Sequence, residues 1–175
     1  MEKANRPSKS TKPEWPFLRD VFTSWAPQAG YEFGADECPW IPNIPGIYNK
    51  FMVLDRHHNS FVNLFKIDPG TVLPPHYHTT PVFGYVIEGE FKYREYDWVA
   101  RPGSTIYEPA GEVHTLVNEG TQPMTAVFHV TGPQVNTTAD GRFLSYLDVG
   151  NLIHYVRDYC EIHGVDDSFL ARIIR

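Results

Sequence analysis

The sequence predicts an all-β fold, an antiparallel barrel or sandwich with helices added at its C-terminal end. Short apolar runs alternate with Gly, Pro and Asn turns at roughly 8–12-residue spacing, which is typical of antiparallel β-folds. Two histidine-containing segments lie within this region, and after Asp148 the apolar residues change to helical spacing. A chain of 175 residues is long enough for one domain with a sizeable core.

The strands are expected in order along the chain, each ending at a turn signal. The apolar runs cover residues 47–54, 60–67, 83–88, 90–98, 105–108, 114–118, 124–130, 134–137 and 143–146. Glycine turns predict two hairpins, one joining 83–88 to 90–98 about Gly89 and one joining the last two strands about Gly141. These strands place the barrel at residues 47–147.

The flanking segments differ from the barrel in composition. Residues 1–12 are polar and lack the apolar stretch of a signal peptide, so we expect a disordered, cytoplasmic N-terminus. Residues 13–46 form an arm rich in proline and aromatic residues, which either covers the barrel or a neighbouring subunit or forms a lid over the site. Residues 148–175 predict two helices, the first ending at Gly164 and the second running from 168 to 175 with Asp167 as its cap.

Charge and composition exclude several classes of partner. The net charge is −6 with no basic cluster, so nucleic acid is not expected to bind. No run of apolar residues is long enough to span a membrane. Cys38 and Cys160 show no metal-binding spacing and are expected to be idle, buried thiols. The unpaired strand edges of a barrel and an aromatic arm are stabilised when another subunit covers them, so we expect a homodimer or homotetramer.

Three histidines predict a metal site built for chemistry. His76 and His78 are two residues apart, so in an extended strand they point to one face. Pro74 and Pro75 favour that extended chain. A third imidazole, from His114, can reach the same ion from a neighbouring strand. Three neutral nitrogens leave one side of a metal open to a ligand.

The motifs around these histidines resemble those of the cupin superfamily, which are small jelly-roll β-barrels. The first reads Gly70, five residues, His76, Tyr77, His78, and the second runs from Gly103 through Pro109 and Gly111 to His114 and Asn118. The first motif departs from the cupin pattern at one position, since Val82 stands where cupins usually carry a glutamate ligand. A site of three histidines is therefore expected.

The alternation of side chains along one predicted strand indicates a carboxylate for this site. In a strand over residues 90–98, Phe91, Tyr93 and Glu95 share one face and Lys92 and Arg94 the other. The charged face belongs in solvent, so Glu95 is expected to point inward, where a metal or a buried cation would compensate its charge. The rival carboxylate is Glu108, just before the second turn.

A closer resemblance, to one enzyme family, implies a reaction for the predicted metal site. Residues 83–89, 95–100 and 107–116 are similar to the 2,4'-dihydroxyacetophenone dioxygenases, and the similarity extends to the C-terminus. That family uses a non-haem iron and O₂ to cleave a carbon–carbon bond next to a ketone. The resemblance implies His76, His78 and His114 as metal ligands and Glu95 as the carboxylate beside the metal.

Together these features predict a metal-dependent cupin dioxygenase acting on a small, aromatic hydroxyketone, as in aromatic catabolism. Fe²⁺ is the expected metal, with Zn²⁺ or another divalent transition metal as alternatives. Glu95 would be the catalytic base, or a fourth ligand of the resting metal. Phe91, Tyr93 and Phe128 would line the substrate pocket, and Val82 and Gly84 would leave room in it. The alternatives are a zinc cupin that binds or senses a small ligand, and a non-redox metal-dependent isomerase or hydrolase.

Overall fold

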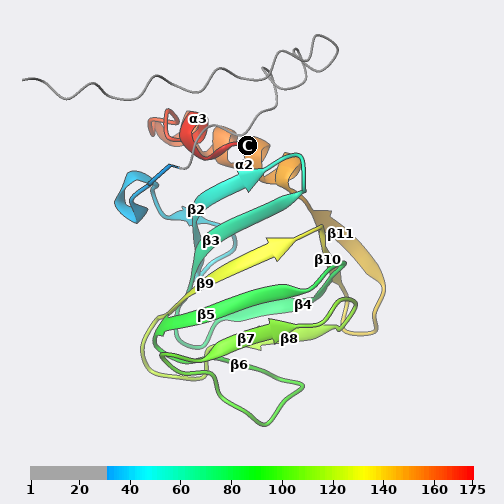
Figure 1. Cartoon of the computed structure of the whole chain (residues 1–175). Helices are drawn as coiled ribbons and strands as arrows, with labels where there is room; N and C mark the ends of the chain where they lie inside the picture. The colour runs from blue at the N-terminus through cyan, green and yellow to red at the C-terminus, as the bar shows by residue number, and fades with distance from the viewer. Residues whose placement is uncertain (1–30) are drawn as a thin grey trace, which may run out of the picture. The chain divides into compact units, whose positions relative to one another are not determined.

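The computed structural model describes residues 31–175, which form two antiparallel sheets and a C-terminal helical segment (Figure 1). The larger sheet has the order β1-β2-β3-β9-β5-β7, with β1 Ile41–Pro42, β2 Ile47–Asp55, β3 Ser60–Ile67, β9 Met124–Thr131, β5 Val82–Glu88 and β7 Thr105–Glu108. The smaller sheet has the order β11-β10-β4-β8-β6, with β11 Phe143–Leu147, β10 Gln134–Thr137, β4 Val72–His78, β8 His114–Val117 and β6 Lys92–Tyr93. The predicted all-β fold is confirmed.

Period-two patterning determines which side chains face the other sheet. In β5, Val82, Gly84 and Val86 are buried, whereas Phe83 and Tyr85 between them are exposed. Most of the inward residues of β2, β3 and β9 are likewise apolar or aromatic, with Asn49 and Asn63 as exceptions, so the core lies between the two sheets.

The helices pack at the β2 side of the sheets. α2 (Val149–His163) begins at Asp148, whose side chain accepts the Asn151 N–H, and ends at Gly164 with φ 64°. Its apolar stripe, which includes Leu152 and Val156, is buried. α3 (Leu170–Ile173) is shorter than predicted, and Phe169 rather than Asp167 precedes it.

The predicted hairpin about Gly89 does not form. β5 pairs with β9 and β7, whereas β6 belongs to the other sheet and pairs with β8, so the chain crosses between sheets at Gly89. Gly89 has φ 69°, and a Cβ there would lie 2.4 Å from the Pro123 carbonyl oxygen. The close approach and the left-handed backbone both require glycine.

The described part of the predicted arm, residues 31–46, lies against β2. It contains a 3₁₀ turn, η1 (Ala35–Glu37), and β1, with Ile41 of β1 in the core. The amino groups of Lys50 and Lys66 lie over the Trp40 ring. Residues 1–12 and the rest of the arm lie outside the described residues.

Both cysteines are free and buried, as predicted. Among residues 31–175, no helix has the length and apolar character needed to cross a membrane.

Candidate metal centre

The three predicted histidines converge between the sheets. His76 and His78 lie on β4, and His76 is the register partner of His114 on β8. The Nε2 atoms of His76 and His114 are 3.2 Å apart, and one ligand atom from each of the three rings lies within 4.8 Å of the others. All three side chains are buried. Period-two geometry and strand pairing therefore place three imidazoles around one point.

Burial keeps these imidazoles in the neutral form that binds metals. It lowers the pKa of His78 to about 3, with help from the neighbouring His76 and His114, and it lowers the pKa of His114 to about 3. The pKa of His76 is also lowered by burial. His76 Nδ1 lies 2.8 Å from the Pro74 carbonyl oxygen, to which it donates, so the lone pair of the neutral ring is on Nε2.

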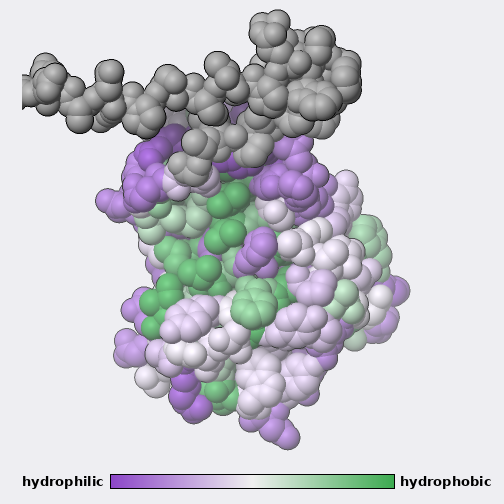
Figure 2. Space-filling view, viewed as in Figure 1, coloured by the Kyte–Doolittle hydropathy of each residue, from purple (hydrophilic) through white to green (hydrophobic). Residues whose placement is uncertain are grey.

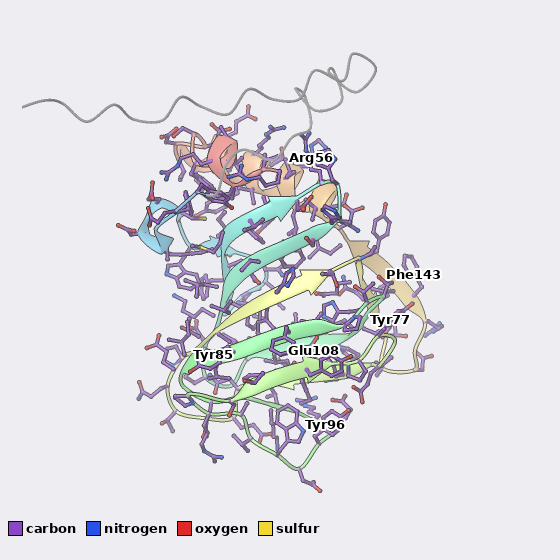
Figure 3. All side chains as sticks on the ribbon, in the orientation of Figure 1. Arg56, Tyr77, Tyr85, Tyr96, Glu108 and Phe143 are labelled. Carbon is purple, nitrogen blue, oxygen red and sulfur yellow. The ribbon has the colours of Figure 1, made fainter. Side chains whose placement is uncertain are left out.

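Glu108 on β7 is the carboxylate that meets the histidines, and Figure 3 labels it. Its Oε2 lies 3.2 Å from His78 Nε2 and 3.5 Å from His114 Nε2. The Tyr93 hydroxyl donates a hydrogen bond to Oε1, whereas Oε2 is buried without a hydrogen-bond partner. Burial raises the Glu108 pKa to about 7, and the Tyr93 hydrogen bond opposes that rise.

A buried carboxylate oxygen without a partner is costly unless a cation compensates its charge. Here that oxygen, Glu108 Oε2, faces the Nε2 atoms of His78 and His114. Three neutral imidazoles and one carboxylate form a donor set suited to a divalent transition metal. The residues present therefore fit a metal held by His76, His78 and His114.

The inward orientation predicted for Glu95 is wrong. The strand ends at Tyr93, and Glu95 lies in the turn that follows, with an exposed side chain. Its Oε2 accepts the Thr115 N–H at 2.9 Å, and the Arg94 N–H donates to the Thr115 carbonyl. Glu95 therefore extends the β6–β8 pairing beside His114 instead of pointing between the sheets. Its catalytic role stays a prediction.

The register of β5 and β7 relates Glu108 to the missing cupin ligand. Val82, at the position where cupins usually carry glutamate, is the direct partner of Glu108. Both side chains are buried and line the same cavity. Directly opposite residues of an antiparallel pair have Cβ atoms about 5 Å apart. Glu108 therefore brings a carboxylate to the cavity from the strand next to the Val82 position.

A cavity of about 270 Å³ adjoins the histidines. Its apolar wall consists mainly of Phe51, Phe61, Phe65, Phe128, Leu73, Leu116, Val82 and Val130. Its polar lining includes His76, His78, Glu108, Asn49 and Asn63. The lining residues that are exposed are Asn43, Asn151 and Tyr155, which indicates that the cavity opens between α2 and the segment after β1.

Only some of the predicted pocket residues line this cavity. Phe128 and Val82 line the cavity, whereas Phe91, Tyr93 and Gly84 do not. A Cβ on Gly84 would lie 2.5 Å from the Phe128 ring, so the room left by this glycine is filled by Phe128. The Tyr93 ring lies against His114 with centroids 4.5 Å apart. Tyr93 therefore lies beside His114 and not in the cavity wall.

Sequence reasoning missed the wall formed by β3 and the contribution of α2. Phe61, Asn63 and Phe65 share one face of β3, so parity within residues 60–67 contained the signal. No comparable local signal placed Leu152 and Tyr155 at the cavity, because the packing of a helix against the sheets is a long-range property.

The comparisons with known proteins agree with this fold. A search of curated proteins finds no match to this chain. An RmlC-like cupin protein from Ralstonia eutropha JMP134 is 25% identical with a TM-score of 0.72, covering 76% of this chain and 88% of that one. A putative acetylacetone dioxygenase from Methylibium petroleiphilum PM1 is 17% identical with a TM-score of 0.66, covering 73% and 95%. An acetylacetone dioxygenase from Acinetobacter johnsonii is 14% identical with a TM-score of 0.64, covering 91% and 99%.

A family model supplies the assignment. The model described as the ChrR cupin-like domain matches residues 32–134, which include both histidine motifs and Glu108. The chain therefore belongs to the ChrR cupin-like family.

Proposed function

We propose that this chain is a metal-dependent dioxygenase that uses O₂ to cleave a carbon–carbon bond next to a ketone in a small, aromatic hydroxyketone. One observation carries the proposal: three buried, neutral histidines and a partnerless carboxylate oxygen meet at an aromatic-walled cavity. The similarity in fold to an acetylacetone dioxygenase and to a putative one is consistent with it. The products would be a carboxylic acid and a small carbonyl or acid fragment.

The protein side chains have distinct roles in this proposal. His76, His78 and His114 hold the metal through Nε2. A bound Fe²⁺ supplies Lewis acidity toward a substrate oxygen and the redox chemistry that O₂ requires. Glu108 Oε2, beside two of the histidines, is placed to accept a proton from a substrate bound there. Tyr93 holds the other carboxylate oxygen and supports the His114 ring.

The cavity supports an uncharged aromatic substrate. Two pairs of rings in the wall meet edge to face, Phe51 with Phe61 and Phe65 with Phe128. An aryl ligand could pack against these rings in the same favourable geometry. Neither Lys nor Arg is among the described residues that line the cavity, so a substrate anion would be compensated only at the metal. Apolar pockets with a few convergent polar groups are typical small-molecule sites.

Three imidazoles are also a common donor set for zinc, which favours a second candidate function. In this alternative, a zinc-loaded protein binds a small ligand, or polarises a carbonyl without net oxidation. The iron and zinc proposals differ in one measurable property, which is consumption of O₂.

The test begins with protein prepared without oxygen and loaded with Fe²⁺. Metal content is measured first, and O₂ uptake is then followed with hydroxyacetophenones and with β-diketones, with the acid product identified. We expect uptake in proportion to bound iron and none in the Zn²⁺-loaded protein. Iron-loaded protein that consumes no O₂ with any of these ketones would contradict the dioxygenase proposal and favour the zinc alternative.

We also propose that the protein is cytoplasmic and self-associates. Two free, buried thiols are typical of a reducing compartment. The outer face of β5 and β7 exposes Phe83, Tyr85, Ile87 and Tyr107. In Figure 2, the hydrophobic residues on this side of the larger sheet gather mainly over β2, β3 and β9, next to these strands. Contiguous apolar surface of this kind often marks an interface, here with a second copy of the chain.

A further inference from the structure

Two asparagines form a polar site within the apolar part of the cavity. Asn49 on β2 and Asn63 on β3 are both buried and line the cavity. The Asn63 Nδ2 donates to Asn49 Oδ1 at 2.7 Å. Asn63 Oδ1 is buried and has no hydrogen-bond partner. Since buried polar atoms are nearly always hydrogen-bonded, this acceptor needs an explanation.

The amide pair is separated from the metal centre across the larger sheet. Asn63 is the register partner of Phe128 on β9, and Phe128 is the partner of Gly84 on β5. Glu108 lies on β7, the next strand beyond β5. Strands lie about 4.8 Å apart, so a ligand that reaches from Glu108 to Asn63 must cross roughly three strand spacings of aromatic wall. A ligand that contacts both ends must therefore be elongated, with an apolar middle part against this wall.

We propose that Asn63, supported by Asn49, is a specificity-determining subsite for a hydroxyl group at the end of the substrate remote from the metal. A hydroxyl donates one hydrogen bond and accepts others, so it can satisfy Asn63 Oδ1 and also meet an amide N–H. The subsite is uncharged, and the described lining residues include no cation, which disfavours a carboxylate or phosphate there. This inference rests on the proposed function only in taking the cavity as the substrate site.

The subsite follows from the position of Asn63 between two aromatic residues. Phe61, Asn63 and Phe65 point the same way from β3, so an amide interrupts an otherwise apolar face. A leucine of similar volume would fill the same space without leaving an unsatisfied acceptor. The pair Asn49 and Asn63 therefore offers a hydroxylated ligand a hydrogen-bond acceptor that an apolar wall would lack.

The experiment compares two ligands that differ only at this end. 4'-Hydroxyacetophenone and 4'-methylacetophenone share the ketone and have similar size. Their affinities are measured by calorimetry on the full-length protein loaded with Zn²⁺, so that no turnover occurs. One hydrogen bond to a buried amide predicts a preference of roughly five- to tenfold for the hydroxyl compound in the wild type.

The variant Asn49→Leu/Asn63→Leu replaces both partners with apolar side chains and should remove the preference while retaining affinity for the methyl compound. Asn63→Ala is the second variant, should the double replacement disturb folding, and it should also remove the preference. Leu73→Met, which changes the cavity wall but not the amides, should keep it.

Three results would overturn the proposal: equal affinities in the wild type, a preference that survives in the double variant, or no binding of either ligand. The measurement separates this subsite from the dioxygenase proposal. Loss of the preference in the variants together with an iron-loaded protein that consumes no O₂ would reject the reaction and keep the subsite.

Discussion

Replacing Glu108 with glutamine should stabilise the metal-free protein at pH 8 and weaken its affinity for a metal. In the folded protein, burial raises the pKa of this carboxyl from its ordinary 4.5 to about 7. The folded state therefore holds a proton that the unfolded state has lost between these pH values. The free energy of unfolding must then fall as pH rises through this window, and stay low above it.

The magnitude follows from the two pKa values. A difference between 4.5 and about 7, at 1.36 kcal/mol per pKa unit, corresponds to roughly 3 kcal/mol when the transition is complete. Most of this change lies between pH 5 and pH 8. The neutral glutamine of Glu108→Gln has no such dependence and keeps an acceptor for the Tyr93 hydroxyl. The difference in stability between variant and wild type should therefore shift by roughly 2–3 kcal/mol in favour of the variant.

Urea denaturation of the metal-free proteins at pH 5 and pH 8 measures this difference. The histidines are present in both proteins, so most of their own pH dependence cancels. Glu119→Gln, which makes the same change at an exposed ion pair with Lys92, is the control and should show little effect. Zinc titration against a chromophoric chelator should give the opposite order, with Glu108→Gln binding about 10–100-fold more weakly.

A variant that is no more stable than the wild type at pH 8, or a stability difference that does not change with pH, would refute this reasoning. Either result would mean that Glu108 has a compensating partner in the metal-free protein. Unchanged zinc affinity would separately remove Glu108 from the metal centre.

The remaining predictions concern the other ligands, Glu95 and the sheet face. His114→Ala should lose most of its bound metal while the barrel stays folded, measured by metal analysis and circular dichroism, and full occupancy would exclude a site of three histidines. If Glu95 is the catalytic base, Glu95→Gln should keep its iron and lose about 10²–10⁴-fold in kcat; if it only holds the Thr115 N–H, turnover should persist and Glu95→Ala should lower the melting temperature. The wild type should sediment as a dimer or tetramer at micromolar concentration, and Phe83→Ser/Tyr107→Ser should shift it toward monomer; a clean wild-type monomer would contradict self-association.

The histidine site could be predicted from sequence because its geometry is local. Two residues of one strand share a face whatever the strand packs against, and the motif spacing places His114 on the neighbouring strand. Strands such as β3 and β5 were predictable for the same reason, since the alternation within each of them does not depend on the rest of the fold.

The carboxylate could not be assigned in this way. The parity of Glu95 assumed a regular strand over residues 90–98, but the chain crosses to the other sheet at Gly89 and its strand ends at Tyr93. Glu108 has the inward parity in β7, yet only the pairing of β7 with β5 brings it beside Val82 and the histidines. Strand pairing between residues distant in sequence determined which carboxylate meets the three histidines.

The pairing of Val82 with Glu108 makes this relationship testable by exchange. If the carboxylate has only moved across one strand pair, Glu108→Val should lose zinc affinity and Val82→Glu/Glu108→Val should regain much of it, because both positions are buried and line the same cavity. The exchange conserves the total volume and charge of the pair, so large changes in folding are not expected. Recovery in the exchanged variant, measured by the same chelator competition, would show that the histidines accept a carboxylate from either strand.

If affinity stays as low as in Glu108→Val, the hydrogen bond from Tyr93, which only Glu108 receives, is what positions the carboxylate. In that case Tyr93→Phe should weaken zinc binding on its own.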